Sequence, residues 1–241
     1  MKDYKNYIFD LYGTLVDIHT DEEIAELWEK LSFFYGFYGA IYQPEELKKS
    51  YLAMVAQEKN SYAHEAYPEI ELEYVFQKLF EKKGIKADME LSVHAGQFFR
   101  ILSTEYVRVY EGTKEMLDNL RKNGKNIYLL SNAQEIFTSY ELRYLGLTPY
   151  FDDIFISSSC QCKKPDTKFY QMMLDKHKLK IEECLMIGND NTTDIAGAKA
   201  LGMDSLYIHS NLSPELDGVP DSTYYLEKMD MKKLMELLKL S

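Results

Sequence analysis

The stretch 7-YIFDLYGTLVD-17 indicates the first strand of the predicted fold and the acidic residue at its end. A short apolar run from Tyr7 leads to one carboxylate, Asp10, which precedes a Gly–Thr pair. Burying an unpaired aspartate inside an apolar strand is costly, which argues against a purely structural role for Asp10. Two positions later, where a second carboxylate could exchange protons, the chain has Tyr12. The stretch therefore predicts a β-strand that ends in a nucleophile with no partner acid.

The rest of the chain divides into two kinds of pattern. From residue 107 onward, short apolar segments alternate with helical ones, which is typical of βαβ units in a doubly wound parallel sheet. The expected strands are 126–132, 152–158, 184–190 and 205–210, and the expected helices are 112–124, 133–146, 166–178 and 192–202. Because 7–11 is one more such strand, we expect an α/β core of residues 1–15 and 107–241. Residues 16–106 show helical spacing without strand-like alternation and predict an inserted, all-helical domain of about four helices.

The composition and net charge of the chain limit the classes of molecule that it is expected to bind. Hydrophobic residues make up 46% and charged residues 28% of the chain, as in ordinary globular proteins. The net charge of −11, without a basic block, argues against nucleic acid and against an anionic membrane surface. A local pocket can still bind a small anionic substrate. The run 7–11 is too short and too charged to span a bilayer, and nothing resembles a signal peptide. The sequence leaves the oligomeric state open.

Three cysteines, Cys160, Cys162 and Cys184, are an odd and small number. They argue against a disulfide scaffold and favour a reducing cytoplasm. The Cys160–Cys162 spacing lacks the second pair or nearby histidine that a tetrahedral metal site needs, so we expect ordinary, partly buried thiols.

Polar motifs follow the predicted parallel strands, at the edge where open α/β sheets bind ligands. Each motif alone is weak, but four of them at four strand ends indicate one site. They are Asp10 with Gly13 and Thr14; Ser131 with Asn132; Lys163 and Lys164 with Pro165 and Asp166; and Asn189 and Asp190, with Asp194 a helical turn later.

In this order the motifs FDLYGTL, LLSN, KKPD and IGNDNTTDIAGAKALG resemble those of the haloacid dehalogenase (HAD) superfamily. The insertion lies where the α-helical C1-type cap of subfamily I belongs. The resemblance implies a Rossmann-like core with Asp10 as the nucleophile, which would form a covalent ester or acyl phosphate. It implies that Thr14, Ser131 and Asn132 bind the transferred group. Lys164, which directly precedes the proline as the family's lysine does, would stabilise the negative charge.

The resemblance also implies a metal. In the family the ion lies between the nucleophile, the carbonyl two residues later and the acidic loop, which map onto Asp10, Tyr12 and either Asn189 or Asp190. Oxygen ligands of this kind suit Mg²⁺. Asp194 could contact the metal, orient the lysine or cap a helix.

Two positions depart from the phosphatase members. Tyr12 replaces the aspartate that protonates the leaving alkoxide, and a phenol with a pKa of about 10 exchanges protons less readily near neutrality than a carboxyl group at about 4. Asn189 puts an amide in the first acidic place, although Asp190 follows and could supply the negative ligand. We therefore expect the protein to bind Mg²⁺, although the amide of Asn189 is a weaker ligand than a carboxylate. We also expect it to prefer substrates with good leaving groups, because Tyr12 replaces the acid.

A tyrosine after the nucleophile is what the metal-free 2-haloacid dehalogenase branch shows, because halide leaves without a proton. That branch needs an arginine from the start of the cap, and this chain has none between Val16 and Phe99. Its four arginines are Arg100, Arg108, Arg121 and Arg143. We therefore favour a Mg²⁺-dependent phosphatase for a small phosphorylated metabolite, with the dehalogenase as the alternative. A ligand-binding or regulatory protein on a weakened frame is a third alternative, against which the intact Asp10 argues.

Aromatic residues in the insertion allow two interpretations. They could line a substrate pocket or pack in a helical core, and their helical spacing favours packing. The residues are His19, Trp28, Tyr35, Tyr38, Tyr42 and Tyr62.

Overall fold

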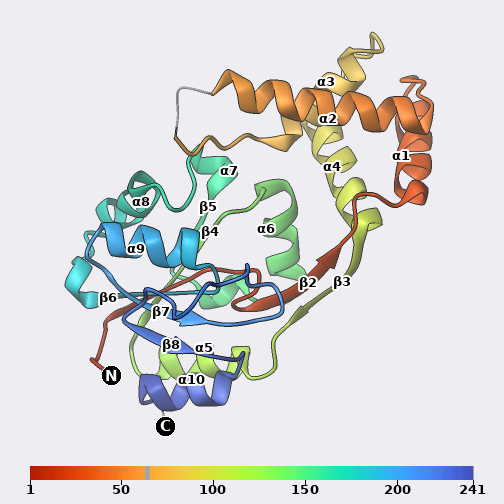
Figure 1. The fold of residues 1–241 in the computed structure, drawn as a ribbon. Coiled ribbons are helices and arrows are strands. Elements are labelled where there is room, and N and C mark those ends of the chain that lie inside the picture. Colours follow the sequence, from red (N-terminus) through yellow and green to blue (C-terminus); the bar gives the residue numbers. More distant parts are fainter. Residues whose placement is uncertain (63–65, 241) are drawn as a thin grey trace.

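Six parallel strands form the central sheet of the computed structural model, which describes residues 1–62 and 66–240. The strand order is β5-β4-β1-β6-β7-β8. The N-terminal strand β1 is central, with Tyr7 beside Ile127 of β4 on one side and Leu185 of β6 on the other (Figure 1). The strands are β1 Asn6–Phe9, β4 Asn126–Ser131, β5 Asp153–Ile156, β6 Cys184–Gly188, β7 Asp204–Ile208 and β8 Tyr224–Leu226. The predicted doubly wound α/β core is confirmed.

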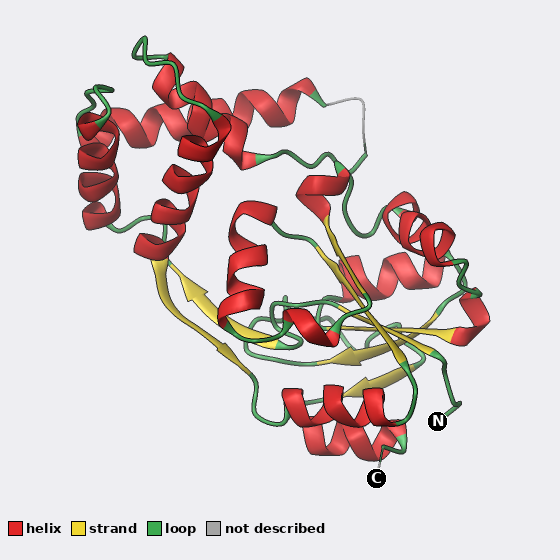
Figure 2. Cartoon of the chain, turned by 180° about the vertical axis from the view of Figure 1, so that it is seen from behind, coloured by secondary structure: helices red, strands yellow, loops and turns green. Residues whose placement is uncertain are grey.

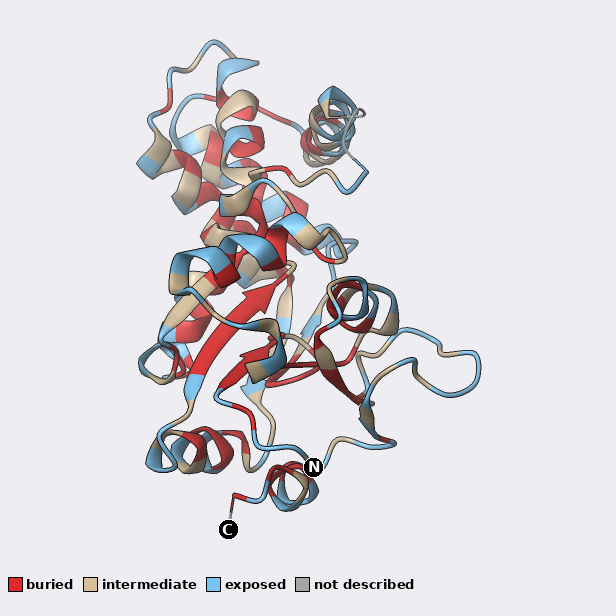
Figure 3. Ribbon diagram, turned by 90° about the vertical axis from the view of Figure 1, so that its left-hand side faces the viewer, coloured by how far each residue is buried: buried red, intermediate tan, exposed pale blue. Residues whose placement is uncertain are grey.

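Helices cover both faces of this sheet, which is why its strands are apolar on both sides. Phe9 packs in a core with Leu117 of α5 and Leu234 of α10, whereas its neighbour Ile8 packs with Phe169 of α8 on the opposite face. Figure 3 shows the buried residues concentrated in the strands and on the helix faces turned toward them. The core helices are α5 Thr113–Lys122, α6 Glu135–Tyr144, α7 Ser157–Cys160, α8 Thr167–His177, α9 Ala196–Ala200 and α10 Met231–Leu238, with short helices at Thr148–Tyr150, Ile181–Glu183 and Asn191–Ile195.

The inserted segment forms four helices within the described residues, as expected. They are α1 Ala25–Phe37, α2 Pro44–Ser61, α3 Leu72–Glu81 and α4 Met89–Ser103. This helical domain has its own core, in which Trp28, Tyr35 and Tyr42 are buried. The hydroxyl of Tyr35 donates to the carbonyl of Phe76, so these aromatics pack as predicted. Tyr38 is half exposed, and Tyr62 is partly exposed.

A two-stranded antiparallel ribbon joins the helical domain to the sheet (Figure 2). Its strands are β2 Val16–Thr20 and β3 Thr104–Val109, so the expectation of an all-helical segment from 16 to 106 is wrong at both ends. Short β-branched and aromatic runs that pair with each other across the insertion explain the difference. The ribbon also orients His19 to an exposed position, where it faces Glu105. None of the described helices is long and apolar enough to cross a membrane.

Candidate active site

Asp10 lies directly after β1, at the carboxyl edge of the sheet, and two neighbouring groups hold its side chain. The ammonium of Lys164 lies 2.6 Å from Asp10 Oδ1, and the hydroxyl of Ser131 donates to the same oxygen at 3.2 Å. Ser131 ends β4, the strand that pairs with β1, so the sheet itself brings these two residues together. The backbone amide of Asp10 donates to the carbonyl of Ile187 in β6. The polar partners of Oδ1 are therefore fixed, whereas Oδ2 accepts no hydrogen bond from any residue within 1–62 and 66–240.

Lys164 is buried and is surrounded by acceptors. Besides Asp10, its ammonium lies 2.6 Å from the carbonyl oxygen of Leu130 and 2.7 Å from Asp194 Oδ1. Burial opposes the charge on this side chain, but the two carboxylates outweigh it and raise the pKa of Lys164 above its ordinary value. Asn132 fixes the backbone here, because its side chain both accepts from the amide of Lys164 and donates to its carbonyl. The ammonium is thus charged and held against Asp10.

Asp194 forms an ion pair with Lys164. Orienting the lysine is one of the three roles that the sequence left open for this residue. Its second oxygen accepts from the amide of Asp190 at 3.0 Å. Burial raises the pKa of the Asp194 carboxyl to about 7, with repulsion from Asp10 adding to the shift and Lys164 opposing it. The phenol of Tyr170, a residue that the motifs did not single out, donates to the Asp194 carbonyl at 2.9 Å. Asp194 therefore orients the lysine, and a metal contact by it stays a prediction.

Asn189 and Asp190 form the loop after β6. Asn189 is buried against Gly13, where an added Cβ would lie 2.2 Å from the amide nitrogen and where φ is +82°. Only glycine fits such a position, which explains the Gly–Thr pair after the nucleophile. The hydroxyl of Thr14 donates to Asn189 Oδ1 at 3.3 Å. Asp190 accepts from the amide of Thr192 at 2.7 Å and so caps the helical turn that follows.

One cavity of about 180 Å³ is lined by Asp10, Tyr12, Asn132, Lys164, Asn189, Asp190 and Asp194, whereas Thr14 and Ser131 are fully buried behind its lining. Asp10, Asp190 and Asp194 supply three carboxylates, and Lys164 supplies one ammonium, so the formal charge of the lining is −3 + 1 = −2. A doubly negative cavity would repel a phosphate unless a cation were also present. Within residues 1–62 and 66–240, no three Asp, Glu, His or Cys side chains converge as a ready-made metal cage. Mg²⁺ commonly takes only one or two carboxylates and completes its shell with water and substrate oxygens, so these residues fit that ion.

The hydroxyl of Tyr12 is directed toward α6 and not toward the Asp10 carboxylate. The phenol donates to Glu141 of α6, and its oxygen lies 3.0 Å from the hydroxyl of Thr138. Burial raises the pKa of Tyr12 well above its ordinary value, and the adjacent Glu141 carboxylate raises it further. The phenol is therefore engaged in the fold and is a poor proton donor for a leaving group.

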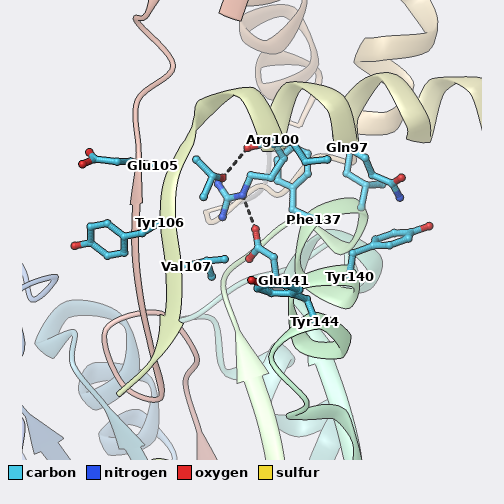
Figure 4. A pocket seen from close by; sticks show the side chains of 12 residues that line it. Gln97, Arg100, Glu105, Tyr106, Val107, Phe137, Tyr140, Glu141 and Tyr144 are labelled. Carbon is cyan, nitrogen blue, oxygen red and sulfur yellow. Dashed lines mark hydrogen bonds and ion pairs between the residues drawn. The ribbon is translucent and has the colours of Figure 1, made fainter. Parts of the chain in front are cut away.

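Glu141 is also paired with Arg100 of α4, whose Nε lies 2.7 Å from Glu141 Oε1 (Figure 4). The guanidinium lies 5.9 Å from the centre of the Tyr12 ring. Arg100 is the first arginine after the segment in which we found none, yet its charge is neutralised by Glu141. The three side chains join the helical domain, the core and the nucleophile loop in one largely buried network. Their chain separations of 41 and 129 residues left no local sequence signal for it.

Replacing Glu141 with glutamine should destabilise the protein by roughly 3 kcal/mol in urea unfolding, because Arg100 would be left buried without its counter-ion. Glu26→Gln is the matched control, since Glu26 pairs with Lys30 on an exposed helix surface and its loss should have no measurable effect. Equal losses in the two variants would show that the buried network adds nothing to stability.

The family comparison agrees with this geometry. The haloacid dehalogenase-like hydrolase family model matches residues 4–202, which include all four motifs. The chain belongs to this family. It is a HAD hydrolase, with a six-stranded α/β core and a helical insertion.

Individual HAD proteins are similar over most of the chain. Pyrimidine 5'-nucleotidase PynA of Streptococcus pneumoniae is 26% identical over 216 residues, covering 85% of this chain and 83% of its own. Phosphoglycolate phosphatase of Vibrio cholerae is 24% identical over 229 residues, covering 92% of each. The crystal structure of 2-haloacid dehalogenase from Pseudomonas syringae pv. Tomato superimposes with a TM-score of 0.69 at 21% identity and covers 98% of each chain. At that identity the superposition is evidence for the fold alone.

Proposed function

We propose that this HAD hydrolase removes phosphate from a small phosphorylated metabolite, with Asp10 as nucleophile and Mg²⁺ as cofactor. The observation that carries the proposal is the ammonium of Lys164, 2.6 Å from Asp10 Oδ1, in a cavity that carboxylate and amide side chains also line. Two similar proteins are named for phosphate ester hydrolysis, the nucleotidase and the phosphoglycolate phosphatase. Cys160, Cys162 and Cys184 form no disulfide within the described residues, which suits our assignment of the reaction to a reducing cytoplasm.

In the proposed reaction, Asp10 Oδ2 attacks phosphorus, because Oδ1 is bonded to Lys164 and Ser131. The bond from phosphorus to the leaving oxygen breaks, and an acyl phosphate forms on Asp10. Water then attacks this intermediate, which releases inorganic phosphate and restores the carboxylate. Lys164 offsets negative charge beside the reacting atoms throughout, and the hydroxyl of Ser131 keeps the carboxylate in place. Thr14 would bind the transferred group once its bond to Asn189 is exchanged for a substrate oxygen.

Asp10, the carbonyl of Tyr12, and Asn189 or Asp190 would hold the Mg²⁺ ion. When bound, the ion supplies the positive charge that lets a phosphate enter a cavity of formal charge −2. The arrangement would use few protein ligands, as Mg²⁺ does when substrate phosphate and water fill the remaining positions.

The residue at the second position after the nucleophile cannot act as the acid for the leaving group, because the hydroxyl of Tyr12 donates its hydrogen bond to Glu141. The phenolate of an aryl phosphate and the carboxylate of an acyl phosphate leave readily without protonation, whereas the alkoxide of a simple alkyl phosphate does not. We therefore propose substrates of the first kind.

Hydrolysis of p-nitrophenyl phosphate should require Mg²⁺. We expect excess EDTA to lower the rate by at least about 100-fold and added Mg²⁺ to restore it, since the ion would provide several kcal/mol of charge stabilisation. Release of p-nitrophenol at 405 nm measures the rate, and the metal-free protein with added Na⁺ is the control for ionic strength. Full activity in excess EDTA would reject the metal-dependent mechanism.

The second candidate function is that of a metal-independent 2-haloacid dehalogenase. The observation that favours it is that the Tyr12 hydroxyl is hydrogen-bonded to Glu141 and cannot protonate a leaving group, because halide leaves without a proton. Its test is chloride release from 2-chloropropionate in EDTA. Against it, Arg100 is neutralised by Glu141, and without a metal ion the three carboxylates that line the cavity would repel an anionic haloacid. Turnover of neither substrate class, with retained binding of phosphate, would instead favour a ligand-binding role.

A further inference from the structure

A second cavity of about 600 Å³ adjoins the nucleophile cavity and takes no part in the steps above. The two cavities share Asn132, Lys164 and Thr193 in their linings, so a substrate can extend from one into the other. Tyr67 and Glu69, from the segment before α3, form the wall that the helical domain contributes. Its volume is within the range of small-molecule sites.

Hydrogen bonds fix the wall from the helical domain to the core. Glu69 accepts from the hydroxyl of Ser157 at 2.8 Å and from the amide of Ile70 at 3.1 Å. Gln134 donates to the carbonyl of Ile70 and accepts from the amide of Leu72. The carboxylate of Glu69 is thus hydrogen-bonded to neutral donors, and the segment before α3 is held over the core loops.

Lys163 also lines this cavity. It is half buried, and its ammonium has neither an ion pair nor a hydrogen bond with any residue that the structure describes. Lys164, its neighbour, is by contrast fully engaged by Asp10, Asp194 and Leu130. The backbone clamp between Asn132 and Lys164 fixes the position from which the Lys163 side chain extends. A lysine that lines a ligand-sized cavity and has no ion pair within the described residues is suited to bind an anionic group of the ligand.

We propose that Lys163 binds a second anionic group, a carboxylate or a phosphate, on the leaving-group side of the substrate. This inference rests on the proposed function, because it takes the first anionic group to be the phosphate attacked by Asp10. The leaving group lies opposite the nucleophile in phosphoryl transfer, so it must extend away from Asp10. The adjoining cavity gives it that space, with Tyr67 as an apolar wall for the part between the two charges.

The test measures binding of matched aryl phosphonates, which cannot be hydrolysed, by calorimetry in the presence of Mg²⁺. The wild type should bind 4-carboxyphenylphosphonate about fivefold more tightly than phenylphosphonate, as expected for one half-exposed ion pair. Lys163→Met should remove this difference without changing the affinity for phenylphosphonate, and Lys163→Arg should restore it. A third probe, 1,4-phenylenediphosphonate, distinguishes a phosphate site from a carboxylate site, because Lys163 should increase the affinity more for the probe whose second group fits the site.

Lys122→Met is the control, because it makes the same change in net charge at the end of α5 that precedes β4, at the opposite edge of the sheet. It should leave all three affinities unchanged. Equal binding of the phenyl and carboxyphenyl probes by the wild type, or an equal loss of both in Lys163→Met, would overturn the inference while leaving the phosphatase proposal intact. Failure of the wild type to bind any of the phosphonates would overturn both.

Discussion

Asp10→Asn should lower the rate of p-nitrophenyl phosphate hydrolysis by at least about 1,000-fold while leaving the fold intact. The amide has nearly the shape of the carboxylate but cannot form the acyl phosphate, so the covalent route is lost. Lys164 keeps Asp194 as a counter-ion at 2.7 Å, and the buried ammonium therefore stays paired. We expect the far-UV circular dichroism of the variant to match the wild type.

Asp217→Asn is the matched control, since it makes the same chemical change in an exposed loop and should keep full activity. Mass spectrometry of the Asp10→Asn protein is needed, because slow deamidation would regenerate aspartate. Sustained turnover by a preparation that is free of aspartate at this position would exclude Asp10 as the nucleophile.

The sequence was sufficient to predict five of the six strands of the sheet and the residues at its carboxyl edge. Asp10 and Ser131 each end an apolar run, and the carboxyl ends of parallel strands lie at one edge, so their convergence follows from the strand assignment alone. The helix α10 was also within reach of the sequence, because Met231, Leu234 and Leu238 repeat at helical spacing. We did not predict it, nor the three-residue strand β8, which is too short to give a periodic signal.

Contacts across the chain could not be predicted in this way. Local spacing does not indicate that Tyr12 donates to Glu141 or that Arg100 neutralises that carboxylate, because each pairing depends on how the helical domain meets the core. The ribbon strands β2 and β3 are separated by the whole insertion, and each is a short run beside helical sequence. That Lys163 lines a cavity without an ion pair to any described residue likewise becomes apparent only from the three-dimensional arrangement.

Lys164→Met should have the second large effect, on stability as well as on activity. Methionine fills nearly the same volume but leaves Asp10 and Asp194 buried without their shared cation. Removing one partner of a buried ion pair costs about 3–5 kcal/mol, and here two carboxylates lose their counter-ion at once. We expect that loss in the free energy of urea unfolding at pH 8, together with a rate of hydrolysis at background level.

The loss should also depend on pH in a definite direction. Lys164 opposes the rise in the pKa of Asp194, so its removal raises that pKa further above the value in the unfolded chain. A carboxyl group with a raised folded-state pKa binds its proton more readily when folded, and its destabilising effect diminishes as the pH falls. Lys164→Met should therefore lose less stability at pH 5.5 than at pH 8, relative to the wild type. Lys176→Met, which removes an exposed partner of Asp153, should show little change at either pH. An equal loss for Lys164→Met at both values would mean that packing, and not the two unpaired carboxylates, accounts for the destabilisation.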